Sequence, residues 1–120
     1  MRSPQHLTPC LCSLQVSAAA REALATIGAA VRNPEVRAAS DTLIRAIADP
    51  VKQTRPALET LRDTVFVHVV DVSSLALILP VITRGMKERG GEAKKAAALI
   101  LGNLVRCHEP DLALVCLHIV

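Results

Sequence analysis

The stretch Thr64–Pro80, TVFVHVVDVSSLALILP, contains the chain's one aromatic residue, Phe66, and one of its densest apolar runs. A transmembrane helix needs about 20 apolar residues in succession, but His68, Asp71 and the Ser73–Ser74 pair interrupt this run. A carboxylate and two hydroxyls in the middle of a span would be costly in lipid. The stretch therefore does not predict a membrane span.

The stretch divides at Asp71. Its first half, Thr64–Val70, has the β-branched content of a strand, but one short strand without a partner would leave its backbone groups unpaired. We therefore expect a buried crossing between helices, with Phe66 packed between layers. After Asp71, Ser73 would cap a helix that contains Pro80. One face of that helix carries Leu75, Ile78, Leu79, Ile82 and Met86.

Apolar residues spaced by three and four predict further helices before this stretch. Ser17 would cap the first, and Asn33–Pro34 would begin the second. The third would begin near Thr54, because Pro56 is tolerated only in a first turn. The expected buried faces contain Val16, Ala20, Ala23, Leu24, Ile27 and Val31, then Val36, Ala39, Leu43, Ile44 and Ile47, then Leu58, Leu61 and Val65.

Two more segments follow the stretch. Gly90–Gly91 separates it from a helix with lysines on one side. The apolar side of that helix carries Ala93, Ala96, Ala97, Ile100, Leu101 and Leu104. Glu109–Asp111 then begins another apolar segment, which is cut off at Val120.

The helix starts recur at a fixed interval. The first helix of each predicted hairpin would begin near Pro34, Ser74 or Pro110, and the second helices recur at a similar interval. This interval of roughly 37–40 residues is the period of two-helix solenoid repeats such as HEAT. Each hairpin buries its faces only by stacking on a neighbour. The predicted fold is all-α, a right-handed α-solenoid of HEAT-type helical hairpins.

This solenoid would occupy residues 16–120, with hairpins near 34–65 and 74–105 and partial repeats at both ends. It amounts to about two and a half repeats of a longer array. Residues 1–15, with two prolines and no sustained apolar run, would be unstructured or weakly ordered.

Composition limits the classes of function. The chain has 120 residues, of which 51% are hydrophobic and 1% aromatic, and a net charge of +3. Recognition of single-stranded nucleic acid by stacking needs several aromatic side chains, so it is disfavoured. The N-terminal segment lacks the apolar centre of a secretory signal, and we expect a cytoplasmic protein. The four cysteines are then free thiols: Cys10, Cys12, Cys107 and Cys116.

No pattern of residues predicts catalysis. Gly90–Gly91 is not followed by the Lys-Ser/Thr of a phosphate-binding loop. The histidines are scattered, without the spacing of a metal-ligand pair; they are His6, His68, His108 and His118. We expect no catalytic residues, no cofactor and no metal.

The most suggestive charged feature is a basic cluster around Gly90–Gly91. It consists of Arg84, Lys87, Arg89, Lys94 and Lys95. These side chains could contact an acidic surface such as ribosomal RNA phosphates, mainly without sequence readout. Alternatively, the cluster is a solvated turn that Glu88 and Glu92 partly neutralise.

Several stretches resemble one known family. They are NPEV at Asn33–Val36, DP at Asp49–Pro50, TVFVHVVDVSSLALILPVITRGMKER at Thr64–Arg89 and KKAAALILGN at Lys94–Asn103. The family is that of the large HEAT-repeat activator of the general-control kinase, which phosphorylates initiation factor 2 during amino-acid starvation. The resemblance lies in the segment shared with translation elongation factor 3. It extends from about Val16 to Pro110, and SLALILP and FVH fit the activator better.

The chain also departs from the family pattern. Pro56 falls where the family has an uninterrupted helix, Gly90–Gly91 replaces more polar turn residues, and the match fades after Pro110. These departures suggest a partial copy or a fragment of a longer protein.

The resemblance implies a non-enzymatic scaffold segment that takes part in activating the starvation-responsive kinase. The implied partners are the ribosome, through RNA phosphates or ribosomal proteins, and an ATP-binding-cassette protein. The kinase contact would lie outside this chain, and neither a membrane nor a small-molecule substrate is implied. Two alternatives are the HEAT region of an elongation-factor-3-like protein and an unrelated HEAT adaptor for protein–protein interaction.

Overall fold

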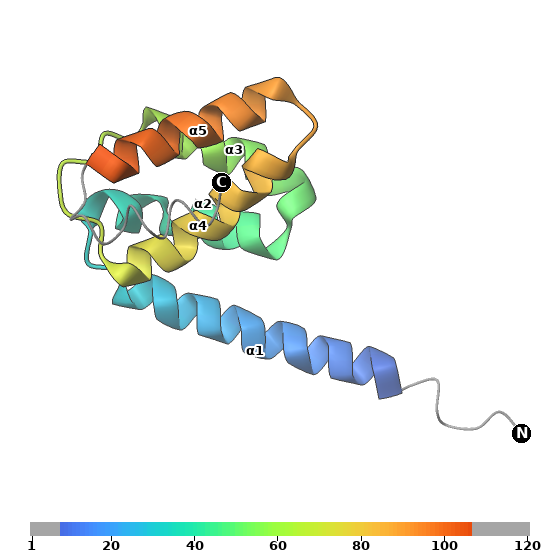
Figure 1. Ribbon diagram of the computed structural model, residues 1–120. Helices are drawn as coiled ribbons and strands as arrows, with labels where there is room; N and C mark the ends of the chain where they lie inside the picture. The colour runs from blue at the N-terminus through green and yellow to red at the C-terminus, as the bar shows by residue number, and fades with distance from the viewer. Residues whose placement is uncertain (1–7, 107–120) are drawn as a thin grey trace, which may run out of the picture.

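The computed structural model describes residues 8–106, with side chains from residue 14 onward. This part of the chain forms five α-helices (Figure 1). They are α1 (Thr8–Ala30), α2 (Pro34–Ala48), α3 (Pro50–Asp63), α4 (Val72–Lys87) and α5 (Gly91–Arg106). None of them is both long enough and apolar enough to cross a bilayer. The segment that was predicted to begin at Glu109–Asp111 lies outside the described residues.

Two helical hairpins make up the body of the molecule. Helix α2 packs against α3 and α4 against α5, and the hairpins stack with α2 on α4 and α3 on α5. The prediction of all-helical, HEAT-type hairpins is confirmed. Because the helices run alternately up and down, the α2–α3 turn and the α4–α5 turn lie at the same edge of the stack.

The starts of α2 and α3 both use proline in the first turn. Asn33 Oδ1 accepts a hydrogen bond from the Val36 backbone N–H at 2.9 Å, so the predicted cap of α2 is confirmed. Helix α3 begins at Pro50, however, and not near Thr54, so Pro56 lies inside it. The longer helix places Thr54 in the core, where its hydroxyl donates a hydrogen bond to the Pro50 carbonyl at 2.6 Å.

Helix α1 departs from the prediction in two ways. It begins at Thr8 and not at Ser17, so residues 8–15 are helical, because no glycine or proline interrupts the chain between Pro9 and Gly28. It also contacts α2 and α4 and extends away from the hairpins (Figure 1). Of its predicted face, Val31, which directly follows the helix, is fully buried and Leu24 and Ile27 are partly buried, whereas Val16, Ala20 and Ala23 are exposed. Helix α1 is therefore not the stacked second helix of a preceding repeat.

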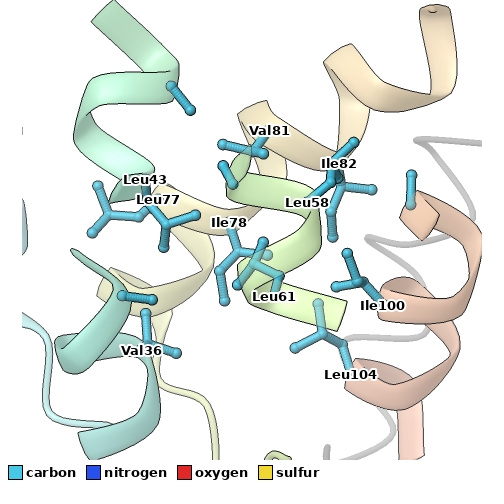
Figure 2. Packing of buried hydrophobic residues seen from close by; sticks show 14 of the residues in the cluster. Val36, Leu43, Leu58, Leu61, Leu77, Ile78, Val81, Ile82, Ile100 and Leu104 are labelled. Carbon is cyan, nitrogen blue, oxygen red and sulfur yellow. The ribbon is translucent and has the colours of Figure 1, made fainter. Parts of the chain in front are cut away.

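The core lies between the two hairpins and is built from aliphatic side chains (Figure 2). Its largest fully buried members come from four helices: Leu43, Leu58, Leu61, Leu77, Ile78, Ile82 and Ile100. Burying each of these side chains contributes about 1.5–3 kcal/mol to folding. Small residues bring the helices close, since a Cβ at Gly85 would lie 2.8 Å from a Leu58 methyl and 3.3 Å from Ala97 Cβ.

The α3–α4 linker is only half buried. Phe66 and Val70 are 7% and 2% exposed, whereas Val65, Val67 and Val69 are 71–76% exposed. The expectation of a fully buried crossing, with Val65 on the face of α3, is therefore wrong. Alternate side chains of an extended backbone point to opposite sides, and only one side of this linker meets the core.

A polar junction ties this linker to the start of α2; we define it as Asn33, Glu35, His68, Asp71 and Ser74. Asn33 Nδ2 donates to the carbonyls of His68 and Val69 at 3.1 and 3.3 Å. Asp71 accepts hydrogen bonds from the Asn33 backbone N–H and the Ser74 hydroxyl. Asp71, and not Ser73 as predicted, is the residue that precedes α4. Its carboxylate joins two helix starts, which a serine at 73 cannot do.

Two carboxylates of the polar junction have lowered pKa values. The hydrogen bond to His68 Nδ1, which lies 2.6 Å from Glu35 Oε1, lowers the pKa of Glu35. Burial alone would raise the pKa of Asp71, but its hydrogen bonds from Ser74 and from backbone N–H groups lower it overall. Both groups therefore stabilise the junction in their charged forms.

Candidate interaction surface at the turn between α4 and α5

Three of the predicted basic residues lie at the end of α4. Arg84 and Lys87 belong to its last turn, and Arg89 lies in the connection to α5. All three are exposed because the intervening positions, Val81, Ile82 and Gly85, face the core. Cations in a last turn also interact favourably with the helix dipole.

These three residues line a shallow depression together with Arg55 of α3. Val51, Glu88 and Gly90 complete its lining. We call the four cations Arg55, Arg84, Lys87 and Arg89 the basic depression. Arg55 comes from the neighbouring hairpin, so the depression exists only because the two hairpins stack.

Arg55 is held across the α4–α5 turn. Its Nε lies 3.5 Å from Glu88 Oε2. Its Nη2 lies 3.4 Å from the point where a Cβ of Gly90 would be, so the glycine leaves room for the guanidinium. Arg55 was not predicted as a site residue. The predicted hairpins could have indicated it, because they place the first turns of α3 at the same edge as the last turn of α4.

The other two predicted residues do not line the depression. Lys94 and Lys95 lie on the exposed side of α5, and Lys95 Nζ pairs with Glu92 Oε1 at 3.2 Å. An exposed pair of this kind contributes little to stability. The structure therefore separates the predicted cluster into three residues of the basic depression and two lysines beside it.

The lining of the depression is suited to binding anions. Four cations face one carboxylate, Glu88, whose side chain is largely covered and paired with Arg55. None of the lining residues is a nucleophile next to a base. Within residues 8–106, no group of three or more histidine, cysteine or acidic side chains could hold a metal ion.

The chain is similar in sequence to several known proteins. The family model described as elongation factor 3/GNC1 HEAT repeat matches residues 51–114. The mouse stalled ribosome sensor GCN1 is 37% identical over 115 residues, which cover 85% of this chain and 4% of that protein. The budding yeast eIF-2-alpha kinase activator GCN1 is 44% identical over 90 residues, which cover 75% of this chain and 3% of that protein. Elongation factor 3 of Mycosarcoma maydis is 32% identical over 91 residues, which cover 76% of this chain and 8% of that protein.

These matches confirm the predicted resemblance, including the segment shared with elongation factor 3. The chain spans about 4% of the length of the mouse and human GCN1 relatives that it matches. No solved structure gives a significant match. Because the family model covers more than half of the 120-residue chain, the protein belongs to the elongation factor 3/GNC1 HEAT repeat family.

Proposed function

We propose that this chain is a non-enzymatic, ribosome-associated scaffold segment in the cytoplasm that takes part in activating an initiation-factor-2 kinase. Two relatives support this reading by their names, the mouse stalled ribosome sensor and the yeast eIF-2-alpha kinase activator. Identity to elongation factor 3 is lower, at 32% against 37% and 44%, which favours the activator over the elongation factor.

The main support from the structure is the set of exposed basic residues at the edge of the stack where the α2–α3 and α4–α5 turns lie. The core-facing sides of α2 to α5 pack against one another, and the cations of the basic depression remain exposed to an anionic partner. A partner with phosphate groups, such as the ribosome, would meet Arg84, Lys87 and Arg89, with Lys94 and Lys95 close by along the chain. Contacts of this kind supply affinity and orientation without reading a sequence.

Co-sedimentation of the chain with purified ribosomes over a range of salt concentrations tests the proposal. We expect binding that weakens steeply with salt and that weakens further when Lys94 and Lys95 are both changed to glutamate. The matched control changes Arg21 and Arg32 to glutamate, which alters the net charge equally but at exposed sites on α1 and just before α2.

A chain that stays in the supernatant at low salt would refute ribosome association. Equal binding by the Lys94→Glu/Lys95→Glu and Arg21→Glu/Arg32→Glu variants would show that Lys94 and Lys95 act through net charge alone and not through their position.

A further inference from the structure

The basic depression differs from an ordinary row of surface charges because two separate hairpins build it. Arg55 projects from α3, whereas Arg84, Lys87 and Arg89 come from α4 and its following turn. The stacking of α3 with α4 and α5 fixes the spacing between the backbone positions that carry these groups. A partner that binds them therefore meets a preformed, concave arrangement of charge.

The chemistry of the lining selects the kind of anion. Three of the four cations are arginines, whose planar guanidinium groups can donate two parallel hydrogen bonds to one phosphate. Successive phosphates along a nucleic-acid strand would offer each of these groups a partner. None of the lining residues is aromatic, so the depression has no surface on which an unpaired base could stack.

We infer that the basic depression binds the phosphate backbone of helical RNA, with Arg55 as the residue that links two repeats in one contact. This inference rests on the proposed ribosome association and narrows it to a ligand and a set of residues. Helical RNA is recognised mostly by its shape and its backbone, which matches a site with four cations and no stacking ring. Lys94 and Lys95 then add long-range attraction and not the principal contacts.

The test measures binding of a short RNA duplex and of purified ribosomes by the full chain. The central variant is Arg55→Gln/Arg89→Gln, and Arg84→Gln/Lys87→Gln is a second variant of the same depression. The comparison variant, Lys94→Gln/Lys95→Gln, removes the same charge beside the depression. Unchanged helical circular dichroism and melting temperature would verify that each variant folds, which is expected because these side chains are exposed.

Each phosphate contact adds about 0.9 to the slope of log affinity against log salt, and hence about 0.9 log unit of affinity at about 0.1 M salt. Losing two contacts should therefore weaken binding of both probes by roughly tenfold to one hundredfold and reduce the slope by about 2. Lys94→Gln/Lys95→Gln should reduce the slope by less than half as much.

The possible failures are distinguishable. If the wild-type chain binds ribosomes and both variants of the depression bind as well as it does, this inference is overturned while the proposed function stands. Ribosome binding that is lost in these variants, without any binding of the duplex by the wild-type chain, would identify an acidic protein surface as the partner and overturn the RNA assignment. Duplex binding that depends on Arg55 and Arg89, without ribosome binding, would support the inference and refute the proposed function.

Discussion

Replacing Asn33 with alanine tests whether the polar junction holds the two hairpins together. Asn33 is 2% exposed and serves two elements at once. Its Oδ1 caps α2 through the Val36 N–H, and its Nδ2 donates to two carbonyls of the α3–α4 linker, those of His68 and Val69. Alanine removes both functions and leaves the Val36 N–H and the two linker carbonyls without these hydrogen bonds.

The expected cost follows from these contacts. Loss of an N-cap side chain costs about 0.5–2 kcal/mol, and loss of a hydrogen bond to the linker costs about 0.5–1.5 kcal/mol. The two carbonyls share one amide group at 3.1 and 3.3 Å, so we count them as little more than one bond. Asn33→Ala should therefore lower the free energy of unfolding by about 2–3 kcal/mol and the melting temperature by roughly 10–20 °C.

Urea unfolding followed by circular dichroism measures this change, and Asn33→Ser separates the two contributions. Serine retains a cap acceptor but is too short to reach the linker carbonyls, so it should recover about 1 kcal/mol relative to alanine. A loss below about 1 kcal/mol for Asn33→Ala would refute the idea that the junction holds the hairpins. Equal losses for serine and alanine would show that the cap contributes nothing.

Two further predictions concern packing and pH. Gly85→Ala should destabilise the fold by about 1–3 kcal/mol, because the new Cβ would lie 2.8 Å from a Leu58 methyl. Gly102→Ala should instead stabilise α5 by about 0.4–1 kcal/mol, because no atom lies within 4 Å of the new Cβ. Thermal melts of the two variants compare them directly, and a shift of the same sign in both would contradict the packing argument. The lowered pKa values of Glu35 and Asp71 contribute stability that is complete above their ordinary values of 4.5 and 3.8 and is lost as the pH falls through the lower, folded values. Urea midpoints at neutral and acidic pH should differ less for Glu35→Gln/Asp71→Asn than for the wild type, and an equal difference would exclude these two groups as the cause.

Much of the helical framework could be predicted because its signals are local. Asn33–Pro34 carries both a capping side chain and a favoured first residue, so the start of α2 was placed correctly. The start of α3 was misplaced because the cost of Pro56 was weighed locally. The burial of Thr54 in the longer helix belongs to the tertiary fold, which can override local preferences.

The exposure of the α3–α4 linker and the composition of the basic depression could not be predicted in full. Both depend on contacts between residues that are distant in the sequence. The valines of Thr64–Val70 predict an extended, apolar segment, but only the packed structure decides which side of it is covered. In the same way, the cluster at Arg84–Arg89 was visible in the sequence, whereas Arg55 joins it only through the register in which the hairpins stack. Lys94 and Lys95 were grouped with these residues by closeness in sequence, but they do not line the depression.

The most direct test of the account is photo-crosslinking to the ribosome from an exposed residue that lines the basic depression. Val51 lines the depression, carries no charge and is 80% exposed, so a photoreactive diazirine residue can replace it without removing a cation. Val16 on α1, 68% exposed, is the matched control position. We predict crosslinks to ribosomal RNA from position 51 and few from position 16. Crosslinks from position 51 to ribosomal proteins alone, or equal RNA yields from both positions, would contradict the account.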